Sequence, residues 1–223
     1  MASHLDLEEQ EQLEQLKAFW KRWGNLITWL VTAALAAFAA WQGWNWYQRD
    51  QAAQAAAMYD AFDHAFAAQD LDKAVGVAGD LKARFGSTAY ATQASLQVAK
   101  LQLEKDKTDD AKQSLTWVAE HGADGGPYRD VARLRLAGLQ LDAKAFDEAA
   151  KTLDAIKSAE FAGLAADRRG DLALLQDKRD VAKAEYQKAL AALDKTQDYR
   201  RIVEAKLATL GVPTVVDTTG APQ

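Results

Sequence analysis

The chain has 223 residues, of which 49% are hydrophobic, and 27 Lys and Arg stand against 32 Asp and Glu, for a formal net charge of −5. Acidic and basic residues are interspersed without a basic block, so nucleic acid is not expected as a partner. The chain has no cysteine, which excludes disulfides and a lipidated cysteine anchor.

Residues 1–23 are predicted to form an acidic, amphipathic cytoplasmic tail. Apolar residues recur three or four positions apart from Leu13 to Ile27, while Glu8, Glu9 and Glu11 lie on the opposite face of the helix. Two interpretations stay open: a helix that lies at the membrane interface, and a docking or degradation signal read in the cytoplasm.

Residues 24–47 are predicted to cross a membrane as one helix. No charged residue occurs from Trp23 to Gln48, and a helix needs roughly 20 apolar residues to cross the hydrocarbon core. Six of the seven tryptophans lie in or beside this stretch, which is typical of residues at membrane interfaces. The predicted interface anchors are Trp20, Lys21, Arg22, Trp23, Trp41, Trp44 and Trp46.

A cleaved signal peptide and a soluble core helix are the alternatives to this anchor. The tripeptide Ala37-Phe38-Ala39 resembles a cleavage site, but the preceding residues are acidic and bulky aromatics follow. We therefore favour a retained anchor. Lys17, Lys21 and Arg22 precede the span and only Arg49 closely follows it, which predicts a cytoplasmic N-terminus and an exported C-terminal domain.

From residue 48 to residue 210, helix-favouring residues dominate and a spaced pattern recurs. An alanine followed by residues four and seven positions later occurs four times, with the alanines 37, 38 and 33 residues apart. Such positions share one face of a helix. The four sets are Ala74/Ala78/Leu81, Ala111/Leu115/Val118, Ala149/Leu153/Ile156 and Ala182/Tyr186/Ala189.

A second helix precedes three of these sets, with Ala99, Ala137 or Gly170 as its small residue and a polar turn after it. In the first set, Phe62 stands where a small residue is expected. Two helices in about 34 residues is the tetratricopeptide period, and a non-repetitive helical bundle is the alternative. The sequence thus predicts an all-α protein: a single N-terminal transmembrane helix followed by a tetratricopeptide-like helical repeat solenoid.

A C-terminal capping helix is predicted over residues 198–210, with Ile202, Leu207 and Leu210 on its apolar side. Gly211 and Pro213 are expected to end it. Residues 211–223 lack an apolar period, so we expect them to be disordered.

The sequence shows no catalytic or metal-binding pattern. It lacks the spacing of a nucleophile elbow, a phosphate loop or a zinc site, and its three histidines are scattered. The acidic residues between 60 and 72 lack the glycine and spacing of a calcium loop. We therefore predict no enzymatic activity, no cofactor and no metal.

Two segments, Leu7–Asn25 before the span and Ala166–Asp171 at the start of the last repeat, resemble the YfgM family. The resemblance implies a bacterial inner-membrane protein with a periplasmic tetratricopeptide-like domain, acting as an ancillary subunit of the SecYEG translocon. It also implies association with a PpiD-like membrane-anchored periplasmic chaperone and handover of emerging, unfolded client polypeptides. It further suggests that the tail controls turnover or binds a stress regulator.

Two functional hypotheses follow. In the first, the chain is a tethered scaffold whose repeats bind a partner protein or an unfolded chain. In the second, it is a transmembrane regulator in which the exported domain alters the state of the tail; a cell-envelope assembly factor is a third, weaker alternative. For the scaffold, the predicted partner-binding groove comprises Gln93, Leu96, Lys100, Leu103, Val131, Leu134, Leu141, Asp167, Asp171 and Leu174.

Overall fold

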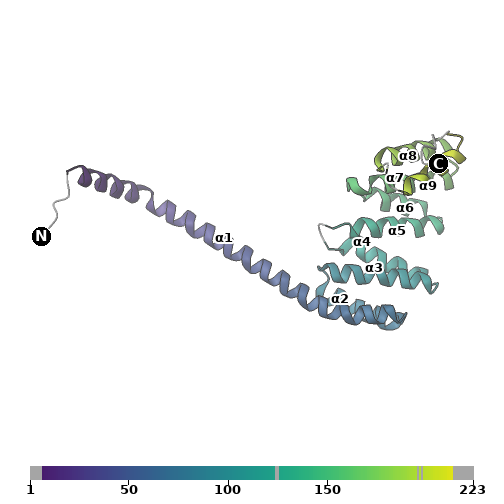
Figure 1. Cartoon of the computed structure of the whole chain (residues 1–223), viewed down its shortest axis with the longest axis horizontal. Coiled ribbons are helices and arrows are strands. Elements are labelled where there is room, and N and C mark those ends of the chain that lie inside the picture. The colour runs from purple at the N-terminus through teal and green to yellow at the C-terminus, as the bar shows by residue number, and fades with distance from the viewer. Residues whose placement is uncertain (1–6, 124–125, 195, 197, 213–223) are drawn as a thin grey trace, which may run out of the picture. The chain divides into compact units, whose positions relative to one another are not determined.

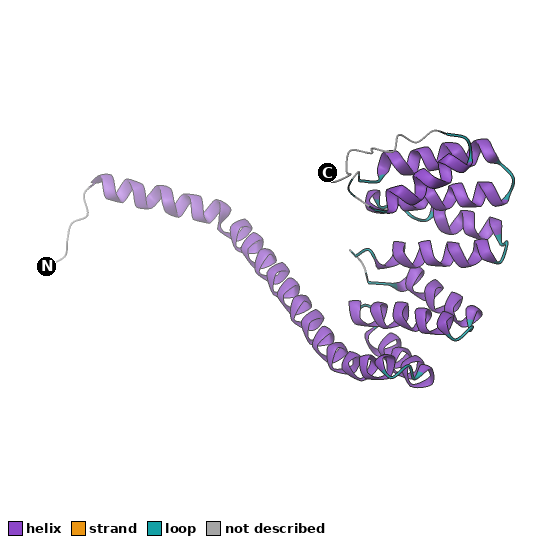
Figure 2. Ribbon diagram, turned by 45° about the vertical axis from the view of Figure 1, so that its right-hand side comes forward, coloured by secondary structure: helices purple, strands orange, loops and turns teal. Residues whose placement is uncertain are grey.

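The computed structural model describes residues 7–123, 126–194, 196 and 198–212. Every regular element in these ranges is a helix (Figures 1 and 2). The chain divides into two compact units, Met1–Ala53 and Gln54–Gln223, and helix α1 (Leu7–Ala67) contributes to both. The all-α prediction is confirmed. Of the tail expected to be disordered, residues 211–223, Val212 packs against the last core cluster and residues 213–223 lie outside the described residues.

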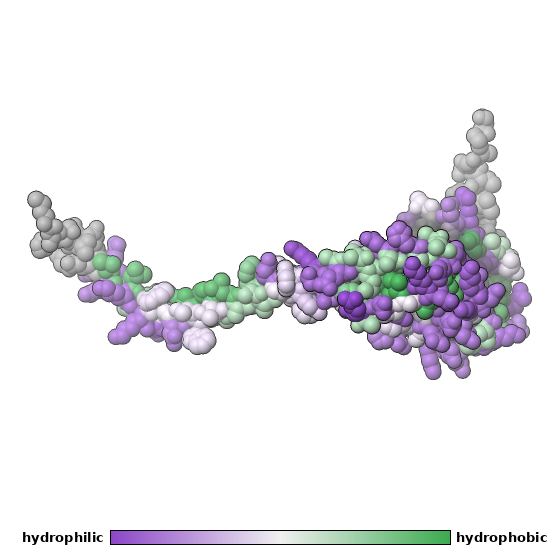
Figure 3. Space-filling model, turned by 90° about the horizontal axis from the view of Figure 1, so that it is seen from below, coloured by the Kyte–Doolittle hydropathy of each residue, from purple (hydrophilic) through white to green (hydrophobic). Residues whose placement is uncertain are grey.

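Within the first unit, α1 carries the candidate membrane span. Among the described residues, it is the one helix that is long and apolar enough to cross a membrane, and its apolar stretch is green and near-white in Figure 3. The side chains of the five predicted anchor tryptophans are exposed, as contact with lipid requires. The helix runs unbroken through residues 23–24 and 47–48, so the proposed ends of the span stay predictions.

The second unit is a series of helix pairs. The last turns of α1 pair with α2 (Leu71–Phe85), α3 (Ala89–Glu104) with α4 (Thr108–His121), and α5 (Tyr128–Asp142) with α6 (Phe146–Asp154). A short 3-10 helix (Ala159–Phe161) leads into α7 (Ala162–Leu175), which pairs with α8 (Arg179–Ala192) before α9 (Tyr199–Thr209). All twelve residues of the predicted repeat sets are buried, which confirms the repeats.

The turn inside each helix pair repeats the same backbone geometry. Gln69, Asp106, Lys144 and Asp177 each adopt a positive φ of 56–59°. In each turn, the next residue's N–H donates to a carbonyl five residues back, as from Lys107 to Gln102 and from Lys178 to Ala173. This is the Schellman ending of a helix. The four positions are 37, 38 and 33 residues apart, the same spacing as the alanine sets.

Helix packing explains the aberrant Phe62. In the second and third pairs, a small residue (Ala99 or Ala137) shares a buried cluster with a leucine (Leu115 or Leu153) that lies sixteen positions later. In the first pair the sizes are exchanged, because Phe62 and Ala78 share one buried cluster. Complementary large and small residues keep the interior close-packed at this position.

Arginines hold successive pairs together. The Arg133 guanidinium of α5 donates to the Ala119 carbonyl oxygen of α4 at 3.1 Å, and Arg169 of α7 donates to the Leu153 carbonyl oxygen of α6 at 2.9 Å. Arg200 of α9 donates to the Leu190 carbonyl oxygen of α8 at 2.6 Å. Each acceptor is a carbonyl in the last turn of a helix, where the helix dipole favours a cation.

The capping helix forms where it was predicted, but its apolar face differs. Val203 and Leu207 are buried against α7 and α8, whereas the side chain of Ile202 is 49% exposed. The prediction for Ile202 is therefore wrong. Residues four apart share a helix face, and the Val203–Leu207 pair, rather than Ile202, faces the preceding helices.

Candidate partner-binding surface

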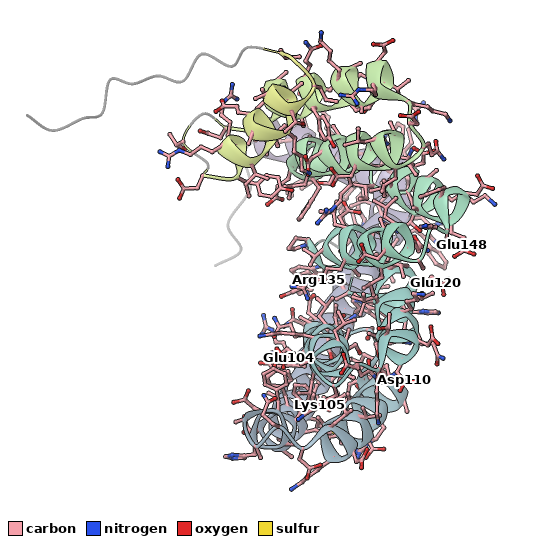
Figure 4. The ribbon with its side chains drawn as sticks, turned by 90° about the vertical axis from the view of Figure 1, so that its right-hand side faces the viewer. Glu104, Lys105, Asp110, Glu120, Arg135 and Glu148 are labelled. Carbon is pink, nitrogen blue, oxygen red and sulfur yellow. The ribbon has the colours of Figure 1, made fainter. Side chains whose placement is uncertain are left out.

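The first helices of the pairs form one side of the second unit. Helix α3 contacts α5, and α5 contacts α7, so these three helices lie next to one another. Figure 4 shows Glu104 of α3 and Arg135 of α5 on one side, and Asp110, Glu120 and Glu148 of α4 and α6 on the opposite side. We call the exposed and half-exposed side chains of α3, α5, α7 and the last turns of α1 the first-helix surface.

The predicted groove residues divide into surface and core. Lys100 and Leu174 are exposed, and Gln93, Leu103, Val131, Leu134 and Asp171 are half-buried. Leu96, Leu141 and Asp167 are buried. Leu96 packs with residues of α4 and α5, and the carboxylate of Asp167 is enclosed by α9. Leu96 and Asp167 are thus core residues of the folded domain, and the binding role of the others stays a prediction.

A pocket of about 360 Å³ opens between α5 and α7. Leu141, Leu174 and Leu175 give it apolar walls, and Arg168 and Asp171 form an ion pair at 3.1 Å beside them. The lining therefore combines apolar walls with charged side chains, which can fix the orientation of a bound group. Three predicted groove residues, Leu141, Asp171 and Leu174, therefore meet at one place.

A buried polar network fastens α9 next to this pocket. The Lys206 ammonium donates to both carboxylate oxygens of Asp167, at 2.8 and 2.9 Å, and to Asp171 Oδ1 at 2.7 Å. The Tyr199 hydroxyl donates to Asp167, and the Tyr186 hydroxyl donates to Asp171, both at 2.7 Å. The side chain of Asp167 is 0% exposed, so its charge depends on these donors.

The network also holds the two tyrosines in their neutral form. Burial raises the pKa of the Tyr186 hydroxyl well above its usual range, and the hydrogen bond to the charged Asp171 raises it further. Burial and the hydrogen bond to Asp167 raise the pKa of Tyr199 in the same way. Both hydroxyls therefore remain hydrogen-bond donors over the physiological pH range.

The sequence did not reveal a second polar group on the first-helix surface. The Gln97 side-chain amide of α3 donates to the Tyr59 hydroxyl of α1 at 2.7 Å, and that of Gln93 donates to the Tyr128 hydroxyl of α5 at 2.6 Å. The rings of Tyr59 and Tyr90 lie 5.5 Å apart. The two bonded residues are 38 positions apart in the first pair and 35 in the second. These separations are close to the repeat length, which is the one signal in the sequence that links the partners.

Comparison with known proteins identifies the family of this chain. The family model for the tetratricopeptide repeat-like domain matches residues 17–212. The chain belongs to this family. The match extends over most of α1 and all of the helix pairs. No solved structure matches the chain.

Three curated relatives carry the name "Ancillary SecYEG translocon subunit". The relative from Neisseria gonorrhoeae is 28% identical over 94% of this chain and 100% of its own length. The relative from Haemophilus influenzae is 27% identical over 82% of this chain and 89% of its own length. The relative from Escherichia coli is 28% identical over 55% of this chain and 59% of its own length. The resemblance seen in the sequence is confirmed, and family and name together point to a non-enzymatic, membrane-anchored role.

Proposed function

We propose that this chain is a membrane-anchored periplasmic adaptor that binds protein partners beside the SecYEG translocon and assists the handover of exported polypeptides to a PpiD-like chaperone. One observation carries the proposal: the relative named as an ancillary translocon subunit matches 94% of the chain, which includes both the candidate span and the repeats. The excess of Lys and Arg before the span supports a cytoplasmic N-terminus.

The first-helix surface is the proposed contact site for the partner. It combines the pocket between α5 and α7 with exposed side chains such as Lys100 and Leu175. Tethering by α1 would raise the effective concentration of this surface near a membrane partner, so a modest intrinsic affinity is sufficient. The surface carries both signs of charge and apolar walls, which suits a protein better than a nucleic acid.

The transmembrane regulator is the second candidate, and the continuity of α1 favours it. One uninterrupted helix, Leu7–Ala67, joins the predicted tail, the span and the first helix pair. A single span transmits a signal poorly unless it contacts another membrane helix, for which small residues such as Ala36 and Ala40 leave room.

Deletion of residues 2–16 separates the two candidates. For the adaptor, we expect the shortened chain to co-purify with translocon subunits from detergent-solubilised membranes as the full chain does, within about twofold, because the binding surface lies after the span. The measurement is quantitative mass spectrometry of the co-purified proteins, with the cellular half-life of both chains measured in parallel. Loss of co-purification would contradict the adaptor, and a changed half-life with intact co-purification would add a regulatory tail to it.

A further inference from the structure

Five side chains on the first-helix surface form an uncharged polar cluster: Tyr59, Tyr90, Gln93, Gln97 and Tyr128. They come from the last turns of α1, from α3 and from the start of α5. All five are half-buried, so each is held in place by its neighbours and still reaches solvent. We call this group the tyrosine–glutamine cluster.

The cluster contains two hydrogen-bonded pairs, one that joins α3 to α1 and one that joins α3 to α5. In each, a glutamine amide nitrogen donates to a tyrosine hydroxyl oxygen, Gln97 to Tyr59 and Gln93 to Tyr128. Among the described residues, neither hydroxyl proton nor either glutamine carbonyl oxygen has a further hydrogen-bond partner in the structure. Each pair therefore presents one donor and one acceptor, the complement of the C=O and N–H of a peptide main chain.

The spacing of the pairs matches that of an extended polypeptide. Gln93 and Gln97 are four residues apart on α3, which places them about 6 Å apart along the helix axis. Alternate residues of an extended chain are about 6.6–6.8 Å apart and present their main-chain groups on the same side. Two alternate residues of one extended segment can thus engage the two pairs together.

The surroundings favour an unfolded chain of no fixed sequence. The five side chains of the cluster are uncharged, with the Asp63 carboxylate close enough to act on the Tyr59 hydroxyl. The Tyr59 and Tyr90 rings, 5.5 Å apart, offer an apolar face against which varied side chains can pack. Rigid tyrosines bring large contact area at small entropic cost. Main-chain recognition carries no sequence preference, which suits polypeptides that are still unfolded.

We propose that the tyrosine–glutamine cluster binds extended, unfolded polypeptide segments through their main chain, with little dependence on sequence. This inference deepens the proposed function, because it supplies the contact through which an adaptor at the export channel would hold its client. The cluster lies on the same first-helix surface as the pocket between α5 and α7 but shares no residue with it.

The test uses the full chain in lipid nanodiscs and a neutral, unstructured nine-residue peptide carrying a fluorophore. Fluorescence anisotropy gives the Kd for this peptide, for a scrambled version and for a version N-methylated at every residue, which lacks all main-chain donors. We expect the scrambled peptide to bind within about twofold of the original and the N-methylated peptide to bind about tenfold or more weakly, since its main chain can no longer donate hydrogen bonds to the two glutamine carbonyls.

The protein variants test the same contact from the other side. Gln93→Met with Gln97→Met keeps the side-chain length but removes both carbonyl acceptors, and we expect it to weaken peptide binding about tenfold. Gln113→Met, on the exposed surface of α4, is the matched control and should leave the Kd unchanged. Thermal unfolding of each variant shows whether the fold is intact, and Tyr59→Phe with Tyr128→Phe, which removes only two hydroxyls, replaces the glutamine variant if that one is unfolded.

Equal binding of the N-methylated peptide, equal binding by the folded double variant, or no binding by the unaltered chain would each overturn the proposal. Co-purification of the unaltered full chain with translocon subunits tests the adaptor function and does not depend on these variants. Failure of the cluster and failure of the adaptor function are therefore distinguishable, since the first appears in peptide binding and the second in co-purification.

Discussion

Replacement of Lys206 by methionine is expected to destabilise the repeat domain by about 3–5 kcal/mol. Lys206 is the one cation that bonds both Asp167 and Asp171 among the described residues, and the side chain of Asp167 is 0% exposed. Removing one member of a buried ion pair leaves an uncompensated charge, which costs about this much. The measurement is urea unfolding of the full chain in detergent, followed by circular dichroism, in which the span contributes a constant helical signal.

Lys188→Met is the matched control. Lys188 pairs with Glu185 at 2.5 Å, but its side chain is 66% exposed, so its loss should change the free energy of unfolding by less than about 1 kcal/mol. Adding Asp167→Asn to Lys206→Met removes the buried charge while an oxygen remains for the Tyr199 hydroxyl, and should recover much of the loss. Equal effects of Lys206→Met and Lys188→Met would contradict the role given to the network.

The pH dependence of unfolding provides a second readout of this network. The pKa values of Tyr186 and Tyr199 are raised in the folded domain, chiefly by burial and then by the neighbouring carboxylates. Their contribution to stability is therefore complete below the ordinary tyrosine pKa of about 10 and is lost as the pH rises above it, because the unfolded chain then releases protons that the folded chain retains.

Gly170→Ala is expected to destabilise the domain, although alanine is the better helix former. A Cβ at position 170 would lie 2.3 Å from Cε1 of Tyr186, whose side chain is fully buried and cannot move aside. Overpacking of this kind costs about 1–3 kcal/mol and outweighs the helix-propensity gain of up to about 1 kcal/mol. Gly76→Ala in α2, where a Cβ meets nothing within 4 Å, should instead stabilise the domain.

A second substitution tests whether the two sites are coupled. Gly170→Ala combined with Tyr186→Leu recreates the alanine and leucine that occupy these positions in the second and third helix pairs. The double variant should therefore be more stable than the sum of the single effects predicts, by about 2 kcal/mol in a double-mutant cycle. Additive effects, or a stabilising Gly170→Ala, would show that the close approach to Tyr186 does not constrain this pair.

The buried stripe of the repeats was predictable because helix periodicity determines which residues share a face. Ala111, Leu115 and Val118 follow that rule, and all three are buried. The exchange of sizes between Phe62 and Ala78 was less apparent, because it depends on two positions in different helices. Once the register of the repeats is known, Phe62 indicates a compensating small residue rather than a break in the pattern.

The polar contacts were harder to predict, because they join residues that only the stacking of pairs brings together. From the sequence, Asp167 and Asp171 were expected on an exposed helix face that contacts a partner. In the structure, Lys206 bonds both carboxylates, from 39 and 35 residues later in the chain, and covers Asp167. Tyr59 and Gln97 likewise meet across α1 and α3. No local pattern in the sequence marks such pairs. The sequence therefore indicated which helices form the surface, but not which of their side chains bond to one another.

Site-specific photo-crosslinking in living cells tests the adaptor account most directly. A photoreactive residue is introduced at Lys100, Arg135 or Leu175 on the first-helix surface, and at Glu120 or Glu148 on the opposite side, all of them exposed. The account predicts capture of translocon subunits or of a membrane-anchored chaperone from the first three positions and little from the last two. Equal capture from both sides, or capture from Glu120 and Glu148 alone, would contradict it.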